Sequence, residues 1–291
     1  MKLFKLSILL CVIAIVGCKN TESDMKSSQE SESEKSQERI ISLNGTLSEI
    51  ISELGYQDQL VAVDVTSIYP ENLKEKATDL GHVMNLNVEA LLQQKPTQIF
   101  AVKKELSADI ISQLNTLEVP VHYYEPEYSV EDAKNLINLV AKDLNTEAPE
   151  KITHNIENKL DVLEEFKSKP RVMFVYARGA GTLLVAGKET PVAKMIELAG
   201  GENAMNTYDD YRPLTTEAVA QANPDVLLFF DSGLQSVNGI EGLKGISGLA
   251  NSTAVKKGQV VSMDGLLLTG FGPRTGEAAV QLNKELSQYA N

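Results

Sequence analysis

Two loops of the chain carry side chains that could bind a ligand. The segment DVTSIYP, Asp64 to Pro70, follows an apolar, strand-like run at 60–63. Pro70 favours an extended conformation for the residue before it, so Tyr69 is expected in a loop or turn. The segment GHVM then places His82 in a second loop nearby. Loops on a rigid scaffold often hold binding residues, so these two side chains are the first candidates.

The surrounding sequence predicts a βαβ unit. A short strand at 39–43 is followed by an Asn-Gly turn and an apolar helical pattern that ends at Gly55. Thr46 as N-cap and Glu49 three residues later would form a capping box at the start of that helix. The strand at 60–63 follows. Strands alternating with helices predict an α/β fold with a parallel sheet.

A second copy of this arrangement is indicated by an internal repeat. EALLQQKPTQIF at 89–100 and EAVAQANPDVLL at 217–228 share Glu, Ala, Gln and Pro in register. Each reads as a helix broken near a proline and followed by a strand, at 98–102 and 225–230. The repeat predicts two α/β lobes of similar topology, over residues 39–128 and 170–291.

The segment 129–169 between the repeats reads as two helices, at 130–144 and at 152–166. A long helical connection would hold the lobes at a nearly fixed separation. The cleft between them is then the expected ligand site.

The beginning of the chain resembles an export signal. Residues 1–17, MKLFKLSILLCVIAIVG, combine a basic start with an apolar run shorter than a membrane span. Cys18 follows Gly17, as in bacterial lipoproteins, where that cysteine becomes the lipid-modified first residue. A short uncleaved anchor is the alternative. Residues 18–38 are rich in Ser, Glu and Lys, which predicts a disordered tether.

Composition narrows the possible functions. The chain has 27 Lys and Arg against 40 Asp and Glu, a formal charge of −13, which disfavours nucleic-acid binding. Its other cysteine, Cys11, lies within the predicted signal, so no disulfide or thiolate chemistry is expected. No G-x-S-x-G, H-E-x-x-H or P-loop motif occurs, and an enzyme is not predicted.

Five motifs together resemble a known family. The chain is similar to the periplasmic binding proteins of ABC importers for siderophores, cobalamin and haem, and most similar to the haem-binding branch. The resemblance runs from about residue 39 to the C-terminus. It is carried by RIISLNGTLSEIISELG, VAVDVTSIYP, LLVAGKETPVAKMIELAGGENAM, YRPLTTEAV and MDGLLLTGFGPRTGEA.

The resemblance implies a fold, a function and an iron ligand. It implies two α/β lobes joined by a rigid helix, and a protein that captures haem and passes it to a permease. It also implies that Tyr69, the tyrosine of TSxYP, coordinates the haem iron. Phenolate is an established haem ligand. Free tyrosine has a pKa near ~10, so a nearby cation should favour the phenolate, and Arg274 of GFGPRT is the candidate.

Other cleft residues follow from the same resemblance. His82 could be a second axial ligand or stack beside the ring. Some relatives hold another haem with a histidine on the first loop of the second lobe, where this chain has Arg178, so one haem is expected. Arg178 could pair with a propionate. Tyr211 and Arg212 lie on another loop of the second lobe and could face the cleft.

The resemblance also implies partners and a location. Glu89 and Glu217 begin the two repeated helices and would meet arginines of a permease dimer served by its ATPase. The protein would be a monomer that touches the membrane only through its lipid, in the periplasm or on the outer face of a Gram-positive cell membrane. An iron siderophore or cobalamin is the alternative ligand.

Overall fold

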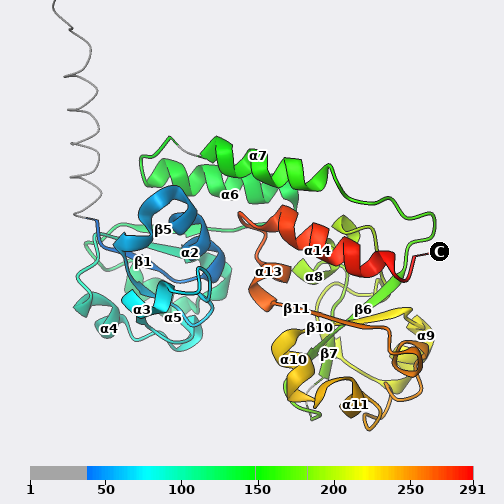
Figure 1. The fold of residues 1–291 in the computed structure, drawn as a ribbon. Coiled ribbons are helices and arrows are strands. Elements are labelled where there is room, and N and C mark those ends of the chain that lie inside the picture. Colours follow the sequence, from blue (N-terminus) through cyan, green and yellow to red (C-terminus); the bar gives the residue numbers. More distant parts are fainter. Residues whose placement is uncertain (1–37, 148, 182, 291) are drawn as a thin grey trace, which may run out of the picture. The chain divides into compact units, whose positions relative to one another are not determined.

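The computed structural model describes residues 38–147, 149–181 and 183–290, so Cys18 and the predicted signal lie outside the described residues. The first sheet has five parallel strands in the order β3-β2-β1-β4-β5. Its strands are β1 (Ile40–Ser42), β2 (Leu60–Val63), β3 (Thr78–Asp79), β4 (Gln98–Val102) and β5 (Val121–Tyr124). Its short helices are α2 (Gly45–Ile51), α3 (Leu73–Lys76), α4 (Val88–Gln93) and α5 (Ala108–Leu114) (Figure 1).

The second sheet has the order β11-β10-β6-β7-β9, and β8 pairs with β6 outside this path. Its strands are β6 (Arg171–Ala177), β7 (Leu183–Val185), β8 (Glu202–Asn203), β9 (Arg212–Pro213), β10 (Val226–Phe230) and β11 (Val260–Met263). The helices around it are α8 (Pro191–Leu198), α9 (Thr216–Ala222), α10 (Asp231–Ser236), α11 (Gly239–Leu243), α12 (Thr253–Lys257) and α13 (Gly265–Thr269). We call each sheet with its helices a lobe.

The two lobes share the topology that the sequence repeat predicts. In the first, α4 leads into β4, which pairs in parallel with β1. In the second, α9 leads into β10, which pairs in parallel with β6. The lobes differ by an antiparallel hairpin, since β7 turns back along β6 and then pairs with β9. The chain passes through β7 and β9 on its way from β6 to α9 and β10, the elements that match those of the first lobe.

The start of α2 differs from the prediction. Asn44, not Thr46, is the N-cap: its backbone is extended and its side chain accepts a hydrogen bond from the Leu47 N–H. Thr46 lies inside the helix and donates its hydroxyl to the carbonyl of Gly270, 2.9 Å away. Glu49 binds Arg274 instead of closing a capping box. Both side chains are therefore used to contact the second lobe.

The connection between the lobes consists of α6 (Val130–Asp143) and α7 (Pro149–Leu160), which lie side by side in Figure 1. The second helix ends earlier than predicted, at Leu160 rather than near residue 166. Leu163 and Phe166 pack on the core of the second lobe instead. The side chain of Asn283 accepts from the N–H of Glu164 and donates to its carbonyl.

Helix α7 packs closely on the last helix, α14 (Thr275–Ser287). A Cβ at Gly276 would stand 2.7 Å from the Ile156 carbonyl oxygen and 2.8 Å from the Lys159 Cβ. Lys159 and Glu277 form an ion pair beside this contact, 3.1 Å apart. The glycine thus allows the connecting helix to pack closely against the second lobe.

Among the described residues, no helix has the length and apolar character needed to cross a membrane.

We predict that Gly276→Ala lowers the free energy of unfolding by roughly 1–2 kcal/mol. Overpacking a close contact typically costs about 1–3 kcal/mol, partly offset by the higher helix propensity of alanine. Chemical denaturation measures the change. Gly245→Ala is the control, because a Cβ there meets only an ordinary contact at 3.5 Å. Equal stability of both variants would contradict close packing at Gly276.

Candidate functional site

A cleft of about 830 Å³ opens between the two lobes. Many of its lining residues come soon after a parallel strand, at the carboxyl end of a sheet. Thr66 follows β2, Lys104 follows β4, Arg178 follows β6 and Gly265 follows β11. Open parallel sheets bind ligands at this edge, because successive loops meet there. Strand direction in both lobes therefore places the cleft.

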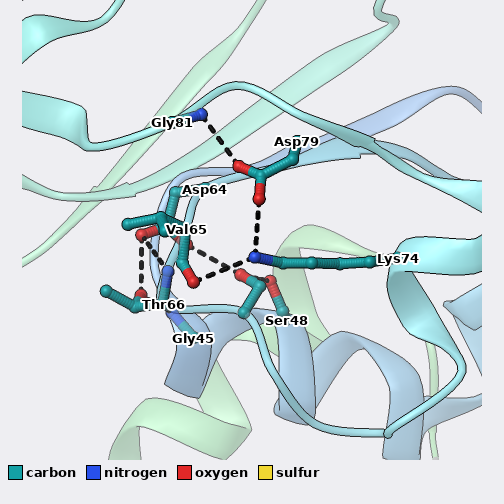
Figure 2. Close-up of polar contacts among 9 residues, drawn as sticks. Gly45, Ser48, Asp64, Val65, Thr66, Lys74, Asp79 and Gly81 are labelled. Atoms are coloured by element: carbon teal, nitrogen blue, oxygen red, sulfur yellow. Dashed lines mark hydrogen bonds and ion pairs between the residues drawn. The ribbon is translucent and has the colours of Figure 1, made fainter.

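The loop that carries Tyr69 is held by the residues just before it in the motif. Asp64 is buried, with 1 % of its surface exposed, and its carboxylate accepts three hydrogen bonds. The donors are the Thr66 N–H and hydroxyl, at 3.0 and 2.6 Å, and the Ser67 hydroxyl, at 2.7 Å. The Thr66 hydroxyl also accepts from the Gly45 N–H at 2.9 Å, which ties the loop to α2 (Figure 2).

The loop of His82 is tied to the same network. Lys74 donates to the Val65 carbonyl at 2.9 Å and pairs with Asp79 at 2.8 Å (Figure 2). Asp79 accepts from the Gly81 N–H at 2.9 Å, and the Val65 N–H donates to the Gly81 carbonyl. The hydrogen bond from Lys74, with that from Gly81, lowers the pKa of the Asp79 carboxyl. The two candidate loops are thus fixed to each other.

Tyr69 lies under Arg274 of the second lobe. The guanidinium carbon is 3.7 Å from the centre of the tyrosine ring, a close cation–π contact. Arg274 also pairs with Glu49 at 2.8 Å, and both side chains are largely buried, at 16 % and 5 % exposed. Tyr69 is half-buried, and its peptide bond to Pro70 is cis. One cation therefore faces both a carboxylate and the candidate phenol.

Burial and pairing affect the pKa values of Glu49 and Arg274 to different extents. Burial raises the pKa of the Glu49 carboxyl, outweighing the hydrogen bond and charge of Arg274. Burial alone would lower the pKa of Arg274, but Glu49 outweighs it and the net shift is upward. The guanidinium is therefore firmly charged, and its field at Tyr69 is partly cancelled by its partner.

His82 lines the cleft with one nitrogen already in use. Its Nδ1 accepts a hydrogen bond from the Met84 N–H at 3.2 Å and caps the short 3-10 helix Val83–Asn85. In a neutral imidazole with Nδ1 as acceptor, Nε2 carries the proton. In this geometry the free nitrogen of His82 is a hydrogen-bond donor, and iron ligation would require the opposite tautomer.

The remaining predicted cleft residues separate into two groups. Arg178 lines the cleft. Tyr211, Arg212 and Arg274 are not among the described residues that line it. Tyr211 packs its ring 6.5 Å from that of Phe174, and burial raises its pKa to about 12. Arg212 is exposed, and its guanidinium is 6.0 Å from the Tyr208 ring.

Tyr69 itself is next to a lining residue, Ile68, without being one of the described lining residues. Glu89 and Glu217 are both exposed and occupy the same position, the second residue of α4 and of α9.

Sequence reasoning missed several lining residues. Lys104 and Met84 line the first lobe, and Tyr128 and Phe230 line the cleft beside them. Val65 and Ile68 also line the cleft, and the apolar side chains of Val65, Ile68 and Met84 are 41–54 % exposed. The available signal was position: Lys104 is the second residue after the strand 98–102, whose carboxyl end points to the cleft.

Two lobes built on mainly parallel strands, a helical connection and a cleft at the strand ends define a two-lobed substrate-binding protein. The chain belongs to the periplasmic binding protein family, whose model matches residues 40–266.

Solved structures and curated relatives agree with this family. The haem-binding protein RhuT from Roseiflexus sp. RS-1, in apo form, matches with a TM-score of 0.83 and 33% identity, over 87% of this chain and 99% of that one. The haem-binding protein BhuT, in complex with two haems, matches with a TM-score of 0.81 and 32% identity, over 86% and 98%. 

Among curated relatives, the uncharacterized ABC transporter substrate-binding lipoprotein YvrC of Bacillus subtilis is 24% identical over 96% of this chain and 95% of its own. A vitamin B12-binding protein of Yersinia pestis is 28% identical over 68% and 71%.

We predict that Arg274→Leu lowers the free energy of unfolding by roughly 3 kcal/mol at neutral pH. The variant leaves Glu49 buried without its cation, and removing one partner of a buried pair typically costs about 3–5 kcal/mol. Without Arg274, the folded state favours protonated Glu49 still more strongly. It then binds more protons than the unfolded state, so stability should fall as the pH rises above about 4.3.

The double variant Glu49→Leu with Arg274→Leu is the control, because it removes both charges together. Denaturation of both variants at a series of pH values upward from about 4 measures the difference. Equal losses for the single and double variants would show that the buried charge of Glu49 is not the cause.

Proposed function

We propose that this chain is the substrate-binding component of an ABC importer, that it binds haem in the cleft between its lobes, and that Tyr69 is the iron ligand. The observation that carries the assignment is the position of Tyr69. It stands beside the cleft, on a loop fixed by Asp64, with the charge of Arg274 against its ring. A phenol held in place beside the cleft is suited to bind ferric iron, since tyrosine is an established haem ligand.

The cleft also offers surface for a flat apolar macrocycle. Val65, Ile68 and Met84 expose apolar side chains on its first-lobe side, and Phe230 lines the second-lobe side. Apolar walls with a few polar groups are typical of small-molecule sites. RhuT and BhuT, the two similar solved structures, are haem-binding proteins by name, which supports haem over a siderophore. The vitamin B12-binding relative covers less of this chain, so cobalamin is the weaker alternative.

In this proposal the other candidates act around the iron. The tautomer held by Met84 makes His82 a hydrogen-bond donor to the ligand rather than a second axial ligand. Arg178 is a cation for one propionate. Tyr211 and Arg212 support the second-lobe wall without contacting the ligand. We propose one haem per chain, because the loop of Arg178 has no histidine that could bind a second haem.

Delivery and anchoring complete the proposal. A lipid on Cys18 would hold the chain at the membrane surface through residues 18–38. The similar protein YvrC is a lipoprotein by name, which supports such an anchor. Glu89 and Glu217 would contact a permease dimer, since pseudo-symmetric positions on two lobes suit a partner with a two-fold axis. A binding role, with no catalytic residue, is what the family supports.

Tyr69→Phe tests the iron ligand, because it keeps the ring under Arg274 and removes only the oxygen. We expect the charge-transfer absorption of an iron–tyrosinate to disappear and the dissociation constant for ferric haem to rise by at least about tenfold, which corresponds to 1.4 kcal/mol. Absorption titration with ferric haem measures both.

His82→Ala is the matched variant for that titration. It should keep the tyrosinate band, because the imidazole is not an iron ligand in this proposal. A tyrosinate band that survives in Tyr69→Phe, or one that is lost in His82→Ala, would reassign the ligand. A wild-type chain that leaves the spectrum of free haem unchanged would overturn haem binding itself.

The double variant Glu89→Ala with Glu217→Ala tests delivery. Haem binding should be unchanged, because both carboxylates lie at exposed helix starts rather than in the cleft. Haem transport by the reconstituted importer should slow more than in either single variant, since rim charges orient a complex. Transport at the wild-type rate would contradict a role in docking, and the two carboxylates would then only stabilise the N-termini of their helices.

A further inference from the structure

Lys104 stands in the cleft as a fixed cation that lacks an acidic partner. Its Nζ donates to the Pro126 carbonyl at 3.0 Å and lies 4.2 Å from the centre of the Tyr128 ring. No carboxylate of the described residues comes within ion-pair distance of it. Its neighbour Glu105 accepts hydrogen bonds from the side chain of Asn44 instead, at 3.1 and 3.2 Å.

The nearby lysines are already paired. Lys103 lies 3.3 Å from Glu125, and Lys194 lies 2.9 Å from Glu189. Lys104 is therefore the cation here whose position is set by a carbonyl and an aromatic ring, while its charge is left for an incoming anion. An ammonium held by fixed contacts loses less side-chain entropy on binding than a free surface lysine.

Tyr128 stands beside this cation, and two further tyrosines lie in the same wall of the second lobe. Tyr128 lines the cleft, and its ring lies 5.8 Å from that of Phe271. Tyr211 and Tyr176 pack behind the wall, against Phe174 and Phe230. The hydroxyls of these three tyrosines make no hydrogen bond to any described residue. Burial, followed by the proximity of the Tyr128 and Tyr176 hydroxyls, raises the pKa of Tyr211, so this group stays a neutral donor.

There is room for a short, flexible arm beside Lys104. Lys104, Pro126 and Tyr128 line both the main cleft and a second cavity of about 550 Å³. The second cavity is also lined by Ser129, by the carboxylates of Glu127, Asp132 and Glu189, and by Lys194, which is paired with Glu189. Its far walls are therefore polar and acidic, and Lys104 is the cation left for an anion at the junction. A ligand body in the apolar cleft could thus place a charged group at the junction of the two cavities.

We propose that Lys104, with the hydroxyl of Tyr128, forms a carboxylate-binding subsite that receives one carboxylate arm of the transported ligand. This subsite rests on the proposed function, and it makes a carboxylate part of what the cleft recognises. Arg178 occupies the second-lobe side of the same cleft, so the ligand is held by one cation from each lobe. A charged ammonium and a phenol are both good donors to a carboxylate.

The experiment compares ferric haem with its dimethyl ester, which has the same macrocycle and no carboxylate. Absorption titration gives the dissociation constants for the wild type, Lys104→Met, Tyr128→Phe and Lys103→Met. Lys104→Met should weaken haem binding about tenfold, as expected for the loss of a hydrogen bond to a charged group, and leave ester binding unchanged. Tyr128→Phe keeps the ring under Lys104 and should weaken haem binding about two- to fivefold.

Lys103→Met removes the same charge from a paired, exposed lysine and should leave both constants unchanged. Thermal unfolding checks that every variant is folded. The subsite is overturned if Lys104→Met weakens the ester as much as haem, if Lys103→Met matches Lys104→Met, or if Lys104→Met binds haem like the wild type. Those outcomes leave haem binding by the wild type intact, whereas a wild type that binds no haem overturns the subsite and the proposed function together.

Discussion

The buried contact between α2 and the segment before α14 is the constraint on which the site depends. Glu49 and Arg274 lie far apart in sequence but pair directly across the lobes. The Thr46 hydroxyl donates to the Gly270 carbonyl beside them, and a Cβ at Gly272 would approach the Thr46 methyl group to 2.7 Å. With α7 fixed on α14, these contacts leave the lobes little freedom to separate. The cleft is therefore largely preformed.

Preformation has an electrostatic consequence for Tyr69. The same guanidinium that joins the lobes covers the tyrosine ring, so the charge near the proposed ligand is set by a structural ion pair. Glu49 reduces that field, but its own pKa is raised by burial. A buried pair of this kind contributes less to stability than its short distance suggests, because desolvation opposes the attraction. Its value here lies in fixing geometry around the phenol.

The chain uses its tyrosines in two environments. Tyr69 stands half-buried on a loop, with the guanidinium of Arg274 over its ring. Tyr211 is packed against the second core, and its pKa is raised to about 12. Position and burial thus distinguish the candidate iron ligand, on a loop beside the cleft, from a tyrosine that is packed in the core.

Patterns along the chain predicted the fold class, the strands at 60–63 and 98–102, and the two-lobe repeat, because each depends on local apolar spacing and on proline and glycine. The sequence also led to the haem-binding branch through short motifs such as TSxYP, and it named Tyr69, His82 and Arg178 as cleft candidates. The predicted cap of α2, Thr46, was wrong. A capping box is defined by residue spacing alone, and Asn44, two residues earlier, is the N-cap in the structure. The contacts of those side chains, in contrast, depend on how the chain folds in three dimensions. The partners of Thr46 and Glu49 lie more than 200 residues away, at Gly270 and Arg274, and Lys104 reaches the cleft because its strand ends there. Such contacts depend on how the two lobes pack together. Residues so far apart in sequence cannot be paired from a local pattern.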